Sequence, residues 1–282
     1  MRLVFCGAMI FMLLSAPGRC TQSARQALAV WGLDVVPSLF PYMVLCRITS
    51  ASLLRTRLPA SLCAAVLGAV GGSPSGAAAL SVCRHEGQLS SPAFRALCTF
   101  CGCISPMFLL GTLQNWGFTK DMCLRVFSIH IAGTSAAALL VFLFSHRLNS
   151  AAAAPAAVKA AQTEDPISMS IRSVLCVGGC IVFFSVAAEW LCMLLPASIP
   201  DAVRAMIHAT LEMSGGIHRL LTLPLGERSR IILCSAAAGF GGFSILLQNH
   251  ILLSDSGTGM PGLFVYSLIR CALCVLAAVI LS

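Results

Sequence analysis

Two segments rich in glycine and serine interrupt apolar stretches of the chain, and their residue types suit the binding of a small anion. The first runs from Gly71 to Gly76 and the second from Gly239 to Ser244. Serine and proline are typical of helix starts, where unpaired backbone N–H groups and a partial positive charge attract anions. In lipid, such a break survives only inside protein or beside a cavity. The two segments therefore predict a pair of helix tips that face one binding site.

Three further polar positions are predicted to line the same site. Gln248 lies four residues after Ser244, on the same helix face. Ser105 precedes Pro106 in another interrupted apolar stretch. Glu212 precedes a Ser-Gly-Gly break, and because an intramembrane acid is costly and usually functional, it is the candidate for coupling Na+ or H+. The candidate substrate-binding residues are Ser73, Pro74, Ser75, Gly76, Gly241, Gly242, Ser244, Gln248 and Ser105.

Other polar residues in apolar stretches have simpler explanations. Glu189 is expected near a helix end, and Gln114 is expected to bond to a neighbouring helix. Arg270 has two interpretations, as the partner of an anion or as a side chain that extends toward a membrane interface; we prefer the second and expect Arg270 to be dispensable for binding. The chain has 15 cysteines, most of them in apolar stretches where a free thiol packs as a small hydrophobe. The CxxC element at 98–101 has no matching pair at ligand spacing, so no metal and no cofactor are expected.

Composition predicts an integral membrane protein. Hydrophobic residues make up 58% of the 282 residues and charged residues 10%, with a mean hydropathy of +0.90. Soluble domains carry about 25% charged residues, which are needed to cover a surface in water. The net charge of +8 comes mostly from residues between apolar stretches, where they orient membrane helices, so no nucleic-acid partner is expected. No catalytic or nucleotide-binding motif is found, so neither enzymatic activity nor ATP-driven transport is expected.

The predicted fold is an all-α, polytopic helical bundle. A span needs about 20 residues, and the arms on either side of a central break are too short to cross alone, so residues 58–83 and 231–253 are predicted to form two re-entrant helical hairpins. The apolar segments are Leu3–Ala16, Ala27–Leu54 with interruptions at Pro37 and Pro41, Leu58–Cys83, Phe94–Trp116, Met122–Phe144, Ile171–Pro196, Val203–Leu223, Ile231–Leu253 and Leu263–Leu281.

The two glycine-rich breaks indicate an internal repeat whose copies lie about 170 residues apart. An Ala-rich polar linker at 146–170 separates the proposed repeats, 27–145 and 171–282. Lys and Arg counts favour repeats with the same orientation, with Val203–Leu223 as a span. Transporter architecture favours inverted repeats, with Val203–Leu223 on the outer interface, and we prefer this arrangement. Residues 1–26 resemble a signal peptide, but an uncleaved membrane helix with a short loop fits the rest of the chain better.

Several motifs in order resemble the sporulation integral membrane protein family of YlbJ type. The resemblance covers roughly residues 27 to 280, and the chain departs from the family pattern at Cys101-Gly102-Cys103, where an Asn is expected before the Ser-Pro element. The matching motifs are Trp31–Tyr42, Gly72–Ala77, Ser105–Phe108 with Gly111, Leu211–Ile217 and Gly241–Gln248.

That family contains the nucleoside-recognition or gate domain and is distantly similar to concentrative nucleoside transporters. The resemblance implies two gate-like repeats, a multi-pass cell-membrane location that includes the membrane around the forespore, and secondary transport of dipicolinic acid during endospore formation. A nucleoside transporter of the same architecture and a non-transporting scaffold of a sporulation complex are the alternatives. The expected partners are a small anionic substrate, membrane lipids and, as an option left open, further copies of the chain in a homo-oligomer.

Overall fold

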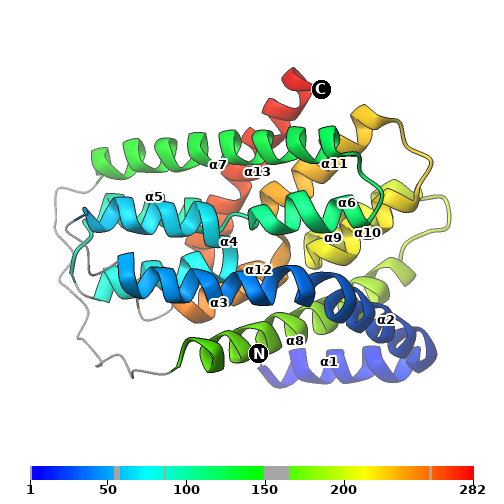
Figure 1. Ribbon diagram of the computed structural model, residues 1–282. Helices are drawn as coiled ribbons and strands as arrows, with labels where there is room; N and C mark the ends of the chain where they lie inside the picture. Colours follow the sequence, from blue (N-terminus) through cyan, green and yellow to red (C-terminus); the bar gives the residue numbers. More distant parts are fainter. Residues whose placement is uncertain (1, 54–57, 86, 149–164, 254–255) are drawn as a thin grey trace.

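The computed structural model describes residues 2–53, 58–85, 87–148, 165–253 and 256–282, and this part of the chain folds into a bundle of helices (Figure 1). The helices are α1 (Arg2–Ser15), α2 (Pro17–Ala29), α3 (Val36–Leu53), α4 (Ala60–His85), α5 (Ser91–Cys101), α6 (Leu113–Asn115), α7 (Lys120–Leu148), α8 (Pro166–Met193), α9 (Asp201–Leu211), α10 (Met213–Thr222), α11 (Glu227–Phe240), α12 (Gly242–Leu253) and α13 (Met260–Leu281), with two π-helical segments, η1 (Val30–Val35) and η2 (Phe108–Thr112).

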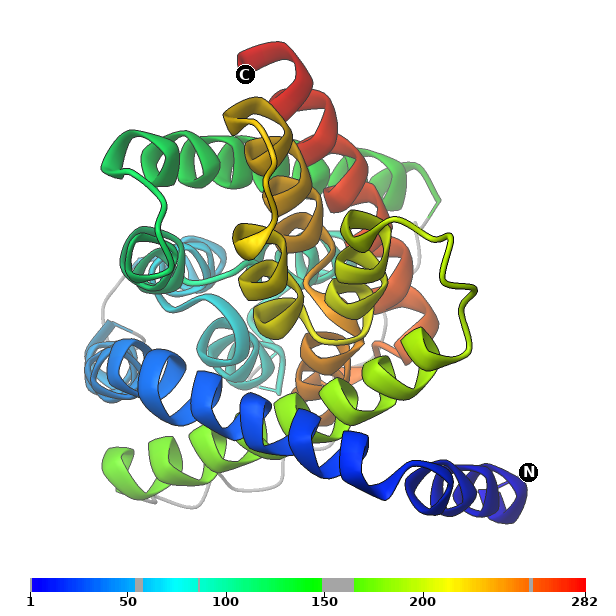
Figure 2. The same cartoon turned by 90° about the vertical axis from the view of Figure 1, so that its right-hand side faces the viewer.

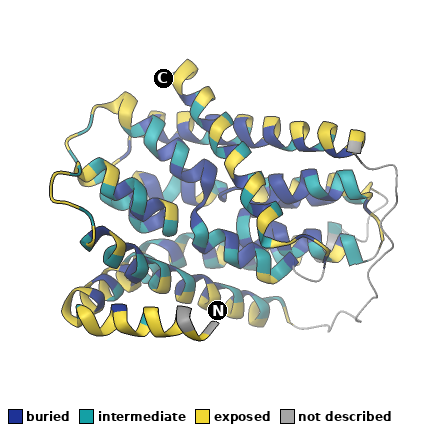
Figure 3. Cartoon of the chain, turned by 180° about the vertical axis from the view of Figure 1, so that it is seen from behind, coloured by how far each residue is buried: buried dark blue, intermediate teal, exposed yellow. Residues whose placement is uncertain are grey.

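Six helical stretches in the described residues are long and apolar enough to cross a membrane. Their outward faces carry large apolar side chains, such as Leu139, Leu175 and Ile280, which are 58%, 57% and 70% exposed. Figure 3 shows that the exposed residues follow the outer faces of the helices, while buried residues fill the centre. Such a surface suits lipid as the solvent. The six stretches are Pro17–Thr49, Ala60–His85, Lys120–Arg147, Pro166–Met193, Glu227–Leu253 and Met260–Leu281.

The first of these stretches, Pro17–Thr49, remains helical at Pro37 and Pro41, where the sequence predicts interruptions. Helix α3 continues through Pro41, and Pro37 lies in its first turn. The π-helical segment η1 immediately precedes this point. Its wider turn gives room to the Pro37 ring, which would otherwise clash with the preceding turn of a regular α-helix.

Helix α4 reverses at Gly72 and Ser73. Gly72 has φ of 58° and ψ of −166°, outside the helical region, and Ser73 is extended. A Cβ added to Gly76 would lie 2.9 Å from the Cα of Gly68. Eight residues span about 12 Å along a continuous helix, so this approach means that the two arms of α4 lie side by side. Small residues on the facing surfaces permit the contact.

Helices α9 and α10 are joined by a similar reversal at Glu212. This residue is extended, with φ of −137° and ψ of 111°, and it ends α9 and begins α10. A Cβ added to Gly216 would overlap the backbone of Ala209, so these two short helices also pack along one another. The stretch Val203–Leu223 is therefore neither a plain span nor a single interfacial helix.

The break at Gly241 and Gly242 has a different geometry from the expected hairpin over 231–253. Both glycines have positive φ, 85° and 79°, and they separate α11 from α12. Helix α11 packs mainly against α13 and α7, whereas α12 packs against α4 and α8. The expectation that the two arms fold back on each other is therefore wrong for this segment. The α5 to η2 break resembles it, since α5 packs against α4 and α7 and the chain then leads on into η2 and α6.

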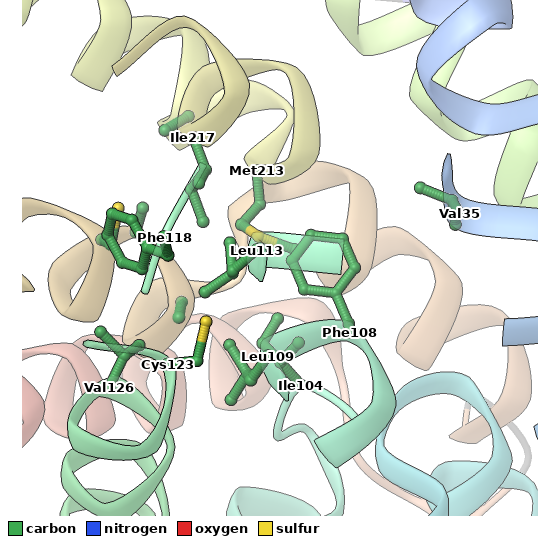
Figure 4. Packing of buried hydrophobic residues seen from close by; sticks show 14 of the residues in the cluster. Val35, Ile104, Phe108, Leu109, Leu113, Phe118, Cys123, Val126, Met213 and Ile217 are labelled. Carbon is green, nitrogen blue, oxygen red and sulfur yellow. The ribbon is translucent and has the colours of Figure 1, made fainter. Parts of the chain in front are cut away.

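A buried apolar cluster holds these broken elements together. Figure 4 shows Phe108, Leu109 and Leu113 from η2 and α6 beside Met213 and Ile217 of α10. Val126 and Cys123 of α7 belong to the same buried cluster. The irregular backbone at the breaks is thus enclosed by protein, as a lipid environment requires.

Of the expected linker at 146–170, residues 149–164 lie outside the described residues. Its two ends are helical, because α7 continues to Leu148 and α8 begins at Pro166, with Asp165 accepting a hydrogen bond from the Ser168 N–H at 3.1 Å. The expected boundary between residues 26 and 27 lies inside α2.

Candidate functional site at four helix breaks

Four of the helix breaks in the described residues meet at one buried cavity. Its volume is about 40 Å³, enough for a water or a monatomic ion but far below the roughly 300–1,000 Å³ of sites for small organic ligands. The polar lining residues come from all four breaks: Ser73, Ser105, Glu212, Ser214, Ser244 and Gln248. The rest of the wall is Pro74 and the apolar residues Val35, Leu39, Ile104, Phe108, Val177, Ile181, Met213 and Ile245.

Ser73 fixes the α4 break against two other elements. Its hydroxyl donates to the Oδ1 atom of Asn249 on α12 at 2.7 Å, and its N–H donates to the carbonyl of Cys103 at 2.8 Å. A Cβ on Gly72 would lie 2.6 Å from the backbone nitrogen of Ser105. Only glycine at position 72 allows both the left-handed conformation and this backbone approach.

Ser244 and Gln248 line the cavity from the first turns of α12. They are 1% and 4% exposed, and Gln248 Nε2 donates to the Ser244 hydroxyl at 3.4 Å. The first N–H groups of a helix have no partner within it, so this end presents donors and a partial positive charge. The predicted face that combines these two residues is therefore present at the cavity.

Ser105 begins the second half of the α5 to η2 break. Its hydroxyl accepts from the N–H of Phe108 at 3.3 Å, in the manner of a helix cap. Beside it, the N–H of Ile104 donates to Nε2 of His130 on α7 at 3.0 Å. His130 is fully buried, so the hydrogen bond identifies Nε2 as the acceptor and places the ring proton on Nδ1.

Glu212 caps α10 at the cavity. Its Oε1 accepts from the N–H of Ser214 at 2.9 Å and its Oε2 from the N–H of Gly215 at 2.6 Å. The side chain is 1% exposed and lies between α9 and α10, outside the six apolar stretches. Burial raises its pKa above the ordinary value for Glu, and these two N–H donors offset part of that rise. A carboxyl group of this kind can exchange a proton with a site beside it.

Four of the predicted site residues lie outside the cavity wall. Ser75 faces the other arm of α4, since a Cβ on Gly71 would lie 3.1 Å from the Ser75 Cβ, and Gly76 packs against Gly68. A Cβ on Gly242 would lie 3.1 Å from the Ala209 carbonyl at the α9 end. Gly241 approaches Arg270 instead. These four residues contribute to the geometry of the breaks, and residues next to them in sequence line the cavity.

Arg270 is buried, contrary to the expectation that it extends to an interface. It is 2% exposed and lies behind the breaks, where its Nε donates to the Gly239 carbonyl at 2.6 Å and one Nη to the Phe240 carbonyl at 3.2 Å. The other Nη donates to the Thr99 carbonyl at 3.0 Å. A cation is favourable at a helix C-terminus, and Arg270 neutralises the ends of α11 and α5 together.

Three comparisons with known proteins bear on the identity of this arrangement. The chain is similar to the sporulation integral membrane protein YlbJ of Bacillus subtilis (strain 168). The two are 21% identical over 311 aligned residues, which cover 91% of this chain and 76% of YlbJ. No family model matches the chain, and no solved structure matches it. Together with the six apolar stretches, the similarity to YlbJ places the protein in a membrane as a multi-pass protein.

Two residues at the site had no strong sequence signal. Asn249 supplies an amide beside Gly102, since a Cβ there would lie 3.5 Å from Asn249 Nδ2. Asn249 lies on α12, far in sequence from the first broken helix that its amide approaches. His130 is a single polar residue in an apolar helix, and nothing in its local sequence specifies the Ile104 N–H as its partner.

The cysteines near the site contribute to helix packing. The thiol of Cys101 donates to the Ala64 carbonyl at 3.6 Å, and that of Cys103 to the Gly68 carbonyl at 3.3 Å. In the part of the chain that the structure describes, no group of three or more His, Cys, Asp or Glu residues is arranged to hold a metal ion. The described cavity therefore offers hydroxyls, an amide, helix N-termini and one carboxyl group for recognition of a ligand.

Proposed function

We propose that the protein is a secondary transporter of a small anionic metabolite. By resemblance to YlbJ-type proteins, this substrate is dipicolinic acid during endospore formation. The observation that carries the proposal is the meeting of four helix breaks at one small cavity, to which each break contributes a polar side chain. Broken helices that meet inside a membrane bundle are typical of secondary transporters, where they form substrate and ion sites. Packing alone would not require hydroxyl, amide and carboxyl side chains at the same point.

The proposed architecture is an inverted repeat whose pairing differs from that expected from the sequence. We assign α4 and the α9–α10 pair as the two re-entrant hairpins. The α5–η2–α6 and α11–α12 segments are then the two broken spanning helices. In Figure 1, α3 ends and α5 begins at one end of the bundle, whereas α8 ends and α11 begins at the other. The two hairpins therefore enter from opposite ends, in the sense that inverted repeats require.

The chemistry of the cavity suits an anion only when Glu212 is neutral. The N-terminal ends of α12 and of the second α4 arm, together with Ser73 and Ser244, supply donors for a carboxylate. An ionised Glu212 beside that carboxylate would repel it strongly in a buried site. We therefore propose that substrate binding is coupled to a proton or Na+ at Glu212.

On this proposal, the small volume of the cavity corresponds to a closed state of the transporter. A ligand the size of dipicolinate does not fit within about 40 Å³, so binding requires the hairpins to separate from the broken helices. A transporter needs such states in alternation, whereas a scaffold protein does not.

A nucleoside is the second candidate substrate. The described lining contains neither Lys nor Arg, and its Ser and Gln side chains suit a neutral, hydroxyl-rich solute as well as an anion. The carboxyl group of Glu212 would then accept from a sugar hydroxyl without the need for protonation.

Uptake into proteoliposomes tests the proposal. Labelled dipicolinate and labelled uridine are offered separately to vesicles with the purified protein, and empty vesicles set the background. We expect dipicolinate uptake above background, reduced in a Ser73→Ala/Ser244→Ala double variant and unchanged in Ser135→Ala, an exposed serine on α7. Uptake of uridine alone would establish the second candidate. Uptake of neither solute by protein that is folded and correctly inserted would refute transport of both substrates.

A further inference from the structure

A second and larger pocket lies at one end of the bundle. Its volume is about 510 Å³, and its walls come from α2, η1, α8, α9 and α10. Figure 2 looks onto this end of the bundle. Gln26, Leu33 and Thr222 are exposed at its rim, so the pocket opens to the surface. Its polar lining includes Ser23, Gln26, Asp34, His208, His218 and Arg219.

His208 is the most unusual residue in this pocket. The side chain is 2% exposed, and neither ring nitrogen has a hydrogen-bond partner of ordinary geometry in the described structure, although a weak interaction with the backbone of Glu212 favours the protonated ring. A buried polar group without a good partner destabilises the folded state, so its position calls for a reason other than stability. The ring lines the pocket, but both nitrogens are buried, so a proton can reach them from the pocket only after a small rotation of the ring or the entry of a water molecule.

Gly215 separates His208 from the carboxyl group of Glu212. A Cβ added at Gly215 would lie 3.0 Å from Glu212 Oε2, 3.1 Å from His208 Cε1 and 3.6 Å from His208 Nδ1. The imidazole and the carboxyl group thus both lie close to Gly215. Glu212 lines the inner cavity and His208 lines the outer pocket, so these two side chains connect the two spaces.

We propose that His208 carries protons between the outer pocket and Glu212, which makes the proton the coupling ion of the inner site. A proton from solvent in the pocket binds an imidazole nitrogen and then moves to Glu212 Oε2, which leaves His208 neutral and Glu212 uncharged. The final transfer requires a small rotation of the ring or one bridging water, because Cε1 faces Gly215 most closely. The proton route itself does not depend on the proposed function. Only the coupling of this proton to a transported substrate rests on it.

The groups around His208 favour brief protonation of the imidazole during proton transfer over a permanently charged ring. Arg219 and His218 face the same pocket from α10 and Asp34 faces it from η1, while Arg219 pairs with Glu189 of α8 at 3.0 Å. Burial, and to a smaller extent the charge of Arg219, lowers the pKa of His208 to about 4. The imidazole is therefore neutral near pH 7 and returns a proton rapidly after accepting it.

Infrared spectroscopy after a rapid pH decrease tests the route without any substrate. The protonated carboxyl band of Glu212 is identified by its absence in Glu212→Gln. We expect the band to grow about 100-fold more slowly in His208→Gln and His208→Asn, the scale of a positioned proton-transfer group. Gly215→Ala should also slow it, because the new methyl group would separate the ring from the carboxyl group. His146→Gln, which changes an exposed histidine on α7, should match the wild type.

If a folded His208 variant protonates Glu212 at the wild-type rate, the proposed route through His208 is wrong. This conclusion does not depend on whether Gly215→Ala folds. The second measurement follows internal pH with a trapped dye during dipicolinate uptake into proteoliposomes. We expect acidification with the wild-type protein and a loss of both acidification and uptake in His208→Gln. If the wild type transports no dipicolinate, the proposed function fails while the infrared rates still decide the route.

Discussion

Replacing Arg270 by Gln should strongly destabilise the protein and weaken its site, although the residue does not line the cavity. The guanidinium donates to three backbone carbonyls, those of Gly239, Phe240 and Thr99, and to the Ser267 hydroxyl at 3.3 Å. Hydrogen bonds to a charged group contribute about 1.5–3 kcal/mol each. Gln can replace one of the three bonds to carbonyls, and loss of the other two lowers the expected free energy of unfolding by about 3–6 kcal/mol.

The substitution should also disturb the candidate site, because Arg270 joins two of the four breaks. It holds the end of α11 and the end of α5 through their carbonyls. Without the Arg270 side chain, the ends of α5 and α11 are no longer held together, so Ser105 and Ser244 can move relative to each other. We therefore expect substrate affinity to fall together with stability in Arg270→Gln.

Denaturant unfolding in detergent, followed by the near-ultraviolet signal of the tryptophans, measures the stability difference. Ser267→Ala is the matched control, since it removes one acceptor of Arg270 and leaves all three carbonyl contacts, and it should cost about 1 kcal/mol. Arg270→Lys should fall between the two, because an ammonium group retains the charge but cannot reach all three carbonyls together. If Arg270→Gln lowers the free energy of unfolding by less than about 1 kcal/mol, Arg270 does not hold α5 and α11 together as described.

The remaining predictions concern the breaks themselves. Gly72→Ala should destabilise the protein by about 2–4 kcal/mol, measured by unfolding, because it adds a Cβ at positive φ against the Ser105 backbone. Ser73→Ala should cost about 1–3 kcal/mol in the same assay, since it leaves the buried Asn249 Oδ1 without its donor, whereas Asn249→Ala in the Ser73→Ala background should add little. Because burial raises the pKa of Glu212, the folded state binds its proton more tightly than the unfolded chain does, so stability should fall as pH rises through and above the ordinary range for Glu. Melting temperatures across pH should show this slope in the wild type and lose it in Glu212→Gln.

The positions of the breaks could be predicted from the sequence because glycine, serine and proline act locally. Gly72 and Gly241 both adopt positive φ, as residues that end a helix commonly do. Glu212 and Ser105 were identified from the breaks beside them, and both line the cavity with Ser73, Ser244 and Gln248. Local chemistry was sufficient here, since a helix that stops in lipid must place its free polar groups in a protein interior.

The direction of the chain after each break could not be predicted in the same way. A glycine permits the chain to leave a helix but does not determine whether the next arm returns along the first. The arms of α4 return because Gly68 and Gly76 form small facing surfaces, whereas Phe240 and Phe243 beside the second break pack against Phe264 of α13. Those partners are distant in sequence, so the second break was assigned to the wrong kind of element.

The position of Arg270 was mispredicted for a related reason. A single Arg in an apolar helix usually extends to an interface, because a buried guanidinium needs several acceptors. Here the acceptors are carbonyls freed by the breaks in α5 and α11, which exist only after both helices are placed. The sequence shows a cation and two interruptions but does not show that they meet.

Arg270 and Glu212 together explain how one closed arrangement of broken helices is held. The cation is bound by helix C-termini and the carboxyl group by a helix N-terminus, so each is satisfied by backbone groups that the breaks left free. Neither forms a described ion pair with the other. Arg270 joins the two broken helices to α13, while Ser73 joins α4 to α12 through a single hydrogen bond to Asn249. The N–H of Ser73 also donates to the Cys103 carbonyl, so the α4 tip is held to both α12 and the end of α5 by backbone and side-chain groups at the breaks.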